Sequence, residues 1–187
     1  MPEQHPVNEL MNDHRLIEKV MSALEERLAQ DNDMFPADFV AQALAFFVEF
    51  ADGHHHYKEE EALFPAMAQH GVPVEGGPIG MMLYEHTLGR ELLAAIRDRL
   101  PQARGGDSAA CASIRQHAGD YIGLLRNHIW KEDNVLFRMA QNVLDPRAVE
   151  ELAVRFHDGA GSAANRQSVR HHVEFASGLT GHAAARA

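Results

Sequence analysis

Apolar residues recur at intervals of three and four along most of this chain, and the alternating pattern of β-strands is almost absent. Such spacing is typical of amphipathic α-helices that share one core. It predicts long helices over about residues 7–30, 36–70 and 78–100, and a fourth that begins near residue 107. We therefore expect an all-α fold, an up-down four-helix bundle.

Turn-forming residues support these limits. Pro36 lies where the first turn of the second helix tolerates proline, and Pro101 is expected to stop the third helix. Asp107 or Ser108 can cap the start of the fourth helix, because both side chains accept hydrogen bonds from free backbone N–H groups. Each predicted helix therefore has its own start or stop signal.

Each predicted helix also carries a histidine on the face that should be apolar, and two of the helices place a glutamate there as well. The inward polar residues are His14, His55, Glu59, His86, His128 and Glu132. Burying an unpaired imidazole or carboxylate costs several kcal/mol. Because six such groups in one core need compensation, they predict a metal site.

The two glutamates belong to a duplicated motif. The segments from His55 to Phe64 and from His128 to Phe137 both read His-x-x-Lys-Glu-acid-x-x-Leu-Phe. Residues four apart share a helix face, so each copy directs an imidazole and a carboxylate to one place, and two facing copies could enclose two metal ions. This donor set differs from cysteine-rich structural zinc sites and from the oxygen cages of calcium and magnesium, whereas iron, manganese, cobalt or zinc accept it.

Residues beside the motif are expected to point elsewhere. His54 and His56 flank the ligand candidate and are predicted to face solvent, although a register shift by one residue, to His56 and Glu60, is an open alternative. Lys58 and Lys131 recur in the two copies and are predicted to extend along the bundle surface with their charges in water.

Four further residues are candidates for roles near the site. Tyr121 is two turns from the fourth helix's candidate ligand and could line an access channel or donate a hydrogen bond, or only pack. Glu85 and Arg90 could orient ligands as a pair or be surface charges. His117 lies too far along the helix and is expected to be a core or mouth residue.

Composition narrows the class of protein. With 187 residues the chain suits one domain, which we place at residues 1–142, followed by a C-terminal helical extension at 143–187 that packs on the bundle and ends in a frayed tail. The net charge of −10, with scattered Lys and Arg, argues against nucleic-acid binding. A single cysteine, no leader-like start and no apolar run of about 20 residues predict a soluble, cytoplasmic protein without a membrane span.

Over about residues 8 to 142 the sequence resembles the hemerythrin-like, or HHE cation-binding, proteins. The resemblance rests on His14, His55-x-x-x-Glu59-Glu60-x-x-Leu63-Phe64-Pro65, Met82-x-x-Glu85-His86-x-x-x-Arg90 and His128-x-x-x-Glu132-Asp133-x-x-Leu136-Phe137. It implies a four-helix bundle with two non-haem iron ions joined by an oxo or hydroxo bridge, for which zinc or manganese could substitute. The ligands it implies are His14, His55, Glu59, His86, His128 and Glu132.

The sequence departs from the oxygen-carrying members of this family. Met82 and Arg90 stand where those proteins have a second histidine on the third helix, and His128 and Glu132 are four residues apart rather than five. These features look more like bacterial iron-centre repair proteins and the iron-sensing domain of a ubiquitin-ligase subunit. Simple reversible O2 carriage is therefore not the function we predict.

The predicted function is binding of, or reaction with, O2, peroxide or NO at a His4Glu2 di-iron centre, in oxygen, NO or iron sensing, storage or stress response. The first alternative is a di-iron enzyme with peroxidase-like, catalase-like or oxidase activity, for which Tyr121 or Glu85 would supply protons. The others are a sensor or iron store whose fold depends on metal, and a metal-free bundle with a polar network.

Overall fold

The computed structural model describes residues 5–30, 34–159 and 163–179, and every regular element in these ranges is helical. The elements are α1 (Val7–Ala29), α2 (Ala37–Phe46), η1 (Phe47–His56), η2 (Glu59–Leu63), α3 (Phe64–Gln69), α4 (Pro78–Arg104), α5 (Ser108–Lys131), η3 (Glu132–Leu136), α6 (Phe137–Val143), α7 (Pro146–Gly159) and α8 (Ala163–Gly178). The η elements are π-helical turns. The all-α prediction is confirmed.

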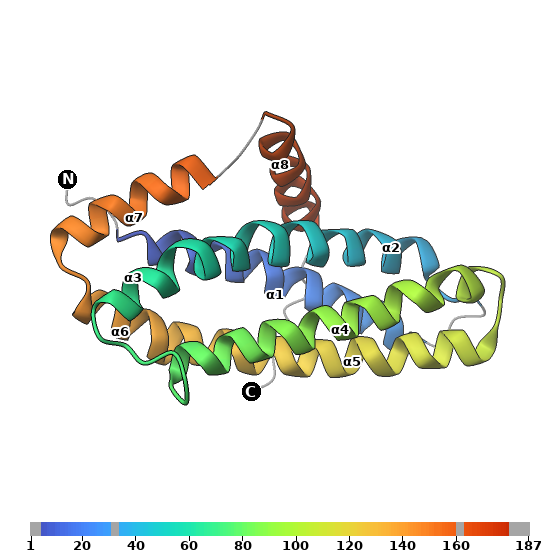
Figure 1. Ribbon diagram of the computed structural model, residues 1–187. Helices are drawn as coiled ribbons and strands as arrows, with labels where there is room; N and C mark the ends of the chain where they lie inside the picture. Colours follow the sequence, from blue (N-terminus) through green and yellow to red (C-terminus); the bar gives the residue numbers. More distant parts are fainter. Residues whose placement is uncertain (1–4, 31–33, 160–162, 180–187) are drawn as a thin grey trace, which may run out of the picture.

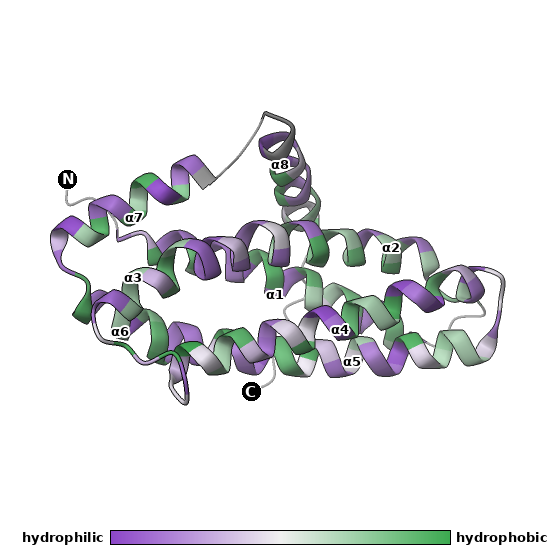
Figure 2. Cartoon of the chain, in the orientation of Figure 1, coloured by the Kyte–Doolittle hydropathy of each residue, from purple (hydrophilic) through white to green (hydrophobic). Residues whose placement is uncertain are grey.

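The elements join into long rods that lie side by side (Figure 1). The elements from α2 to α3 follow one another as one rod, and those from α5 to α6 form another, while α1 and α4 are single helices. The pair α4 and α5 packs along its length, and α1 contacts both α2 and α5. Apolar residues colour the inward faces of these rods, and polar residues colour much of the outside (Figure 2).

The apolar core is divided in two by a polar layer. One cluster includes Ile17, Phe46 and Ile114, and the other includes Leu10, Leu63 and Phe137. The buried histidines and glutamates of the bundle lie between these clusters along the rods, because His14 falls between Leu10 and Ile17 on α1. Apolar packing above and below therefore shields this layer from water.

The spacing of three and four residues also predicts one inward face on α1 and one on α4, and both are confirmed. All of the following residues are buried: Leu10, His14, Ile17, Met21, Leu24, Leu28, Ile79, Met82, His86, Gly89, Leu93, Ile96 and Leu100. Asp107 caps α5, since its side chain accepts hydrogen bonds from the backbone N–H groups of Ala109 and Ala110. Pro101, however, does not stop α4, which continues to Arg104: in the last turn the missing N–H costs only one helical hydrogen bond.

The predicted faces of the two motif-bearing rods are partly wrong. The apolar spacing of three and four residues predicts Val48 and Val135 inside, but they are 44% and 46% exposed, whereas Leu136 is buried. The cause is the π-helical turn, in which an N–H bonds to the carbonyl five residues earlier rather than four. Such bonds run from Phe64 N to Glu59 O in the first rod, and the second rod closes its own turn in the same way.

The C-terminal helices α7 and α8 lie on one side of the rods (Figure 1). Leu152 and Phe156 of α7 are buried in the second apolar cluster, and α8 packs on α1 and η1. The packing of this extension on the bundle is thus observed, whereas its division from residues 1–142 as a separate unit stays a prediction. The predicted frayed tail lies outside the described residues.

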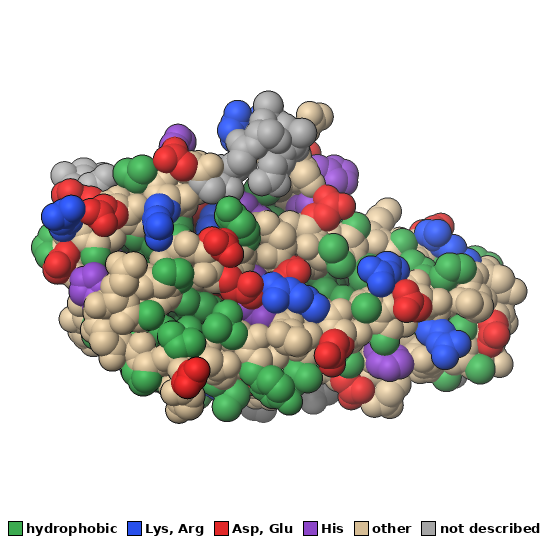
Figure 3. Space-filling view, viewed as in Figure 1, with side chains coloured by type: hydrophobic (Ala, Val, Ile, Leu, Met, Phe, Trp, Pro, Cys, Tyr) green, Lys and Arg blue, Asp and Glu red, His purple; other side chains and the backbone are tan. Residues whose placement is uncertain are grey.

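None of the described helices has the length and apolar character needed to cross a membrane. Acidic and basic side chains are interspersed over the face seen in Figure 3, without a concentrated basic patch.

Candidate metal centre

The structure brings the six predicted residues together in the polar layer. His14 comes from α1, His86 from α4, and the two motif copies supply His55 with Glu59 and His128 with Glu132. All six are buried, and both glutamates are completely inaccessible to solvent. They form one polar centre inside the bundle.

A seventh residue, His56, joins this centre. The potential ligand atoms fall into two groups, within each of which all atoms lie within 4.8 Å of one another. The first group is His56, Glu59, His86 and His128, and the second is His14, His55, Glu59 and Glu132. We call them the three-histidine group and the two-histidine group. Glu59 belongs to both, as expected of a carboxylate between two metal ions.

The prediction that His54 and His56 face solvent is wrong. His56 is only 6% exposed and its ring stacks on His86 at a centroid distance of 3.8 Å. The wide turn of η1 allows the adjacent residues His55 and His56 to point inward together, so the open question of register has the answer that both are inside. The run of three histidines at this position was the only sequence signal for it.

A carboxylate lies at Nδ1 of every histidine in the centre. The Nδ1 contacts are His14 with Asp133 at 2.8 Å, His55 with Asp13 at 3.6 Å, His56 with Asp52 at 3.2 Å, His86 with Glu60 at 2.7 Å and His128 with Glu85 at 2.9 Å. A carboxylate at Nδ1 holds the proton there and leaves Nε2 free as a ligand, which is the usual support of metal-binding imidazoles. A hydrogen bond at Nδ1 therefore leaves Nε2 free in four of the rings, whereas Nδ1 of His55 has the Asp13 carboxylate nearby but no hydrogen-bond partner.

The positions of the Nε2 atoms favour a cation between them. The Nε2 atoms of His86 and His128 are 3.1 Å apart, and both rings donate their Nδ1 protons to carboxylates. Two nitrogen lone pairs would then face each other with no proton between them. A metal ion bound by both removes this conflict.

The two buried glutamates also favour a bound cation. Neither oxygen of Glu59 or Glu132 has a hydrogen-bond partner, although all four oxygens are buried. Burial and the neighbouring Glu132 carboxylate raise the pKa of Glu59 well above its usual value. Two orphaned carboxylates in an apolar core are costly unless a cation compensates them, so the residues present fit a pair of metal ions.

The negative potential of the centre also acts on His14. Burial alone would lower the pKa of this imidazole, but the hydrogen bond to Asp133 and the nearby charge of Glu132 outweigh burial and raise it to about 9. Burial lowers the pKa of His55 and His56 well below the usual value. The metal-free protein thus carries a proton on His14 that a bound metal ion would have to displace.

Two predictions about lysines have different outcomes. Lys58 does not extend along the surface: it is only 3% exposed and bonds to Glu9, Asp13 and His54. Lys131 is one third exposed and pairs with Glu85. The prediction for Lys58 is therefore wrong. Its acidic partners Glu9 and Asp13 both lie on α1, so the local sequence around Lys58 does not reveal them.

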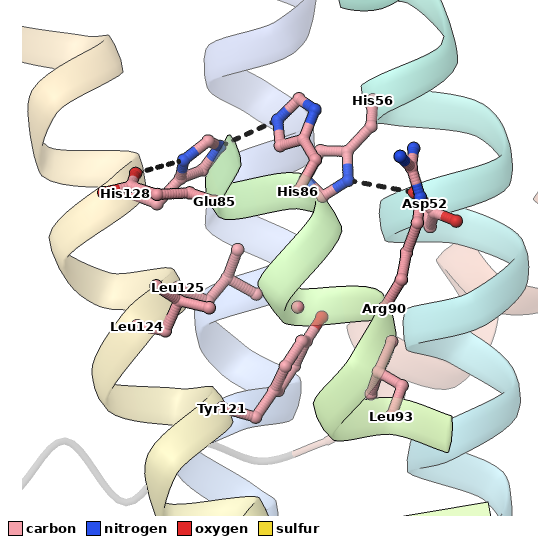
Figure 4. Close-up of a pocket in the computed structure, with 11 residues that line it drawn as sticks. Asp52, His56, Glu85, His86, Arg90, Leu93, Tyr121, Leu124, Leu125 and His128 are labelled. Carbon is pink, nitrogen blue, oxygen red and sulfur yellow. Dashed lines mark hydrogen bonds and ion pairs between the residues drawn. The ribbon is translucent and has the colours of Figure 1, made fainter. Parts of the chain in front are cut away.

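A small cavity of about 10 Å³ adjoins the three-histidine group (Figure 4). Its lining consists of Asp52, His56, Glu85, His86, Gly89, Arg90, Leu93, Tyr121, Leu124, Leu125 and His128. Tyr121 lies below the histidines with its hydroxyl at the end of the ring nearest to them (Figure 4). Burial raises the pKa of this phenol above its usual value, so Tyr121 stays protonated.

Arg90, Glu85 and His117, the other residues predicted near the site, have different partners. Arg90 pairs with Asp52 at 2.7 Å and with Glu60 at 2.8 Å, and so braces the carboxylates of His56 and His86 rather than Glu85. Glu85 instead holds His128. His117 bonds to the carbonyl of Ser113 in its own helix and belongs to neither ligand group.

An all-helical bundle with two buried groups of histidine and glutamate suggests a metal-binding helical protein, and the sequence comparisons give its family. The model of the hemerythrin HHE cation-binding domain matches residues 5–140, so the chain belongs to this family. The resemblance noted from the motifs is confirmed.

The chain is also similar to several named proteins. It is 25% identical over 163 residues to Uncharacterized protein Rv1995 of Mycobacterium tuberculosis, covering 84% of this chain and 63% of that protein. It is 33% identical over 125 residues to Iron-sulfur cluster repair protein YtfE of Yersinia pseudotuberculosis, covering 65% and 55%, and 31% identical to YtfE of Musicola paradisiaca, covering 65% and 54%. The chain thus spans less than two thirds of these relatives. No solved structure matches.

Proposed function

We propose that this chain is a di-iron protein of the up-down four-helix bundle type, in which both ligand groups hold an iron ion. The observation that carries the proposal is the set of four buried carboxylate oxygens without a hydrogen-bond partner, surrounded by inward imidazoles. The proposed ligands are His14, His55, His56, Glu59, His86, His128 and Glu132. Iron accepts this mixture of nitrogen and carboxylate oxygen, and manganese or zinc are the substitutes.

When bound, the iron ions would supply redox and Lewis-acid chemistry. The chain's own residues orient and shield this chemistry. Glu59, common to both ligand groups, and Glu132, which belongs to the two-histidine group, would supply compensating charge, and the Nδ1 carboxylates orient the imidazole rings. Leu93, Leu124 and Leu125 keep bulk water away from the cavity beside the three-histidine group.

The size of that cavity supports a small ligand. A volume of about 10 Å³ is close to the least that holds one water molecule, so an occupant of a few atoms fits while an organic substrate does not. Tyr121 offers a protonated hydroxyl at the cavity, and Arg90 with Asp52 closes its side. We conclude that the protein binds or reacts with O2, peroxide or NO, in sensing, storage or a stress response within the cytoplasm.

Anaerobic reconstitution with Fe(II) tests this function. We expect two iron ions per chain and a new charge-transfer absorption on exposure to air. If the absorption disappears when O2 is removed, the protein carries O2 reversibly; if it persists, redox chemistry or sensing is supported. A chain that binds no iron under these conditions would contradict the di-iron proposal.

Peroxide degradation is the enzymatic version of the same centre. Tyr121 and Glu85 both line the cavity, and Tyr121 is the proton donor that the geometry favours because Glu85 is already paired with Lys131 and His128. Rapid peroxide turnover that survives Tyr121→Phe and Glu85→Gln would count against a proton-donor role for either residue.

A second candidate function is iron–sulfur cluster repair, favoured by the similarity to proteins of that name. The test is restoration of activity in a cluster enzyme inactivated by peroxide or NO. Iron-loaded protein should restore it faster than metal-free protein, and faster than an equal amount of free Fe(II). Equal rates with free Fe(II) would exclude this candidate.

A further inference from the structure

Two lysines near the centre have no role in the proposed ligand set. The chain contains three lysines, Lys19, Lys58 and Lys131, and the last two occupy the same place in the duplicated motif. Arginine is far more frequent in this sequence, so the repeated choice of lysine concentrates this residue type at the centre.

Lys58 is connected to the candidate ligand His55 through Asp13. Its Nζ donates to Asp13 at 3.3 Å, and the same oxygen of Asp13 lies 3.6 Å from Nδ1 of His55. The other two donors of the ammonium go to Glu9 at 2.7 Å and to His54 at 2.8 Å. All three N–H groups are therefore used, which explains how a lysine can be almost completely buried here.

Lys131 makes the equivalent connection in the other copy. Its Nζ pairs with Oε1 of Glu85, and Oε2 of Glu85 accepts from Nδ1 of His128 at 2.9 Å. Asp13 and Glu85 each directly precede the single histidine of their own helix, α1 or α4. The order lysine, carboxylate, histidine is thus built twice from residues at matching positions.

We propose that Lys58 and Lys131 are positioning residues that hold Asp13 and Glu85 against the histidines and set the reduction potential of the bound ions. The proposal rests on the di-iron centre proposed above. A carboxylate at Nδ1 makes an imidazole a stronger donor to metal. An ammonium on that carboxylate draws its negative charge away, so the imidazole donates less strongly.

The sign of the effect follows from charge. Replacing lysine by a neutral residue makes the imidazole more electron-rich and removes a positive charge from the neighbourhood of the ions. Both changes favour the more highly charged, oxidised state. The reduction potential should therefore fall in the lysine variants.

A purely structural ion pair is the competing explanation, since each lysine also links its rod to a neighbouring helix. Such a pair would change the melting temperature without changing the properties of the metal. The two explanations can be separated by measuring both quantities on the same samples.

The experiment compares Lys58→Met, Lys131→Met and the matched control Lys19→Met, which removes an exposed lysine of α1. Each full-length variant is loaded with iron, its potential is measured by a spectroscopically monitored redox titration, and its Fe(II) affinity by competition with a chelator. We expect a lower potential with no loss of Fe(II) affinity in the first two variants, and wild-type values in the control. Lys58→Arg and Lys131→Arg should restore the potential.

Unchanged potentials with lowered melting temperatures would overturn the proposal and leave two structural ion pairs. If Lys58→Met does not fold, the partly exposed Lys131 decides the outcome. Failure of the wild-type chain to bind iron is a different result, because it contradicts the di-iron centre itself and is seen before any variant is made.

Discussion

The two halves of the bundle can be compared residue by residue. In the first half, α1 carries Asp13 and His14, and in the second half α4 carries Glu85 and His86. Asp13 lies at the motif histidine His55, and Glu85 at the motif histidine His128. In return, His14 contacts Asp133 and His86 contacts Glu60, the acids that follow the two motif glutamates. The paired acids and histidines of the two halves therefore contact one another in the same arrangement.

The halves differ at one residue that matters most. His56 of the first copy corresponds to Ile129 of the second, and both side chains are buried. The first rod is π-helical over η1 before the motif, whereas α5 is regular up to Lys131. The duplicated motif thus supplies corresponding ligand candidates in both halves. The additional His56 gives one ligand group three histidines, whereas the other has two.

The largest effect is expected at Glu59, the residue common to both ligand groups. Glu59→Gln removes charge shared by both positions and should reduce iron from two ions per chain toward none, measured by metal analysis after desalting. Glu132→Gln, in one group only, should retain about one ion. The exposed Glu61→Gln is the control. Equal losses of iron in Glu59→Gln and Glu132→Gln would show that the two glutamates contribute equally to metal binding, contrary to the expected difference.

His56→Ile makes the first copy like the second. The change removes one nitrogen ligand from the three-histidine group and leaves the two-histidine group intact, so one ion should be lost while the other is kept. Iron analysis and the absorption spectrum measure this, with the exposed His157→Ala as a control. Retention of two tightly bound ions would assign His56 to packing against His86 instead.

A smaller effect is expected at the acids that follow the motif glutamates. Asp133→Asn and Glu60→Gln should each weaken metal binding by about 10- to 100-fold, because the ring of His14 or His86 loses its oriented acceptor. Chelator competition measures the affinity, and Asp98→Asn on the exposed face of α4 provides the reference. Unchanged affinities would mean that packing alone orients these rings.

The smallest effect concerns α8, which covers η1 in the first half alone. Glu49 of η1 accepts hydrogen bonds from Ser168 at 2.6 Å and His172 at 3.1 Å, and these bonds lower the pKa of its carboxyl group. A lowered carboxyl pKa contributes stability above the usual value of 4.5, and this contribution is lost as pH falls through the lowered pKa.

Hydrogen exchange of α8 amides should therefore accelerate at acidic pH in the wild-type chain more than in Glu49→Gln. The variant already lacks the charge and should show faster exchange at neutral pH. Identical exchange in both proteins across this range would remove Glu49 from the docking of α8.

The sequence predicted some helices better than others for a physical reason. The faces of α1 and α4 follow the 3.6-residue period throughout, so their apolar spacing located His14 and His86 correctly. The motif rods contain π-helical turns, which change the period and moved His56 inside and Val135 outside. Nothing in the local sequence marks these turns: Pro65 follows η2, but Arg138 stands at the same place after η3.

The buried centre is surrounded by more acidic than basic side chains. The two candidate glutamate ligands and the five carboxylates at Nδ1 give seven negative charges, and Lys58, Lys131 and Arg90 give three positive ones. Apart from Glu9, which also pairs with Lys58 but is largely exposed, the remaining four negative charges would balance two divalent ions in the proposed di-iron centre. Oxidation of each ion by one electron would leave two uncompensated positive charges in a buried space, where they are costly. The oxidised protein should therefore attract small anions that the reduced protein has no electrostatic reason to bind.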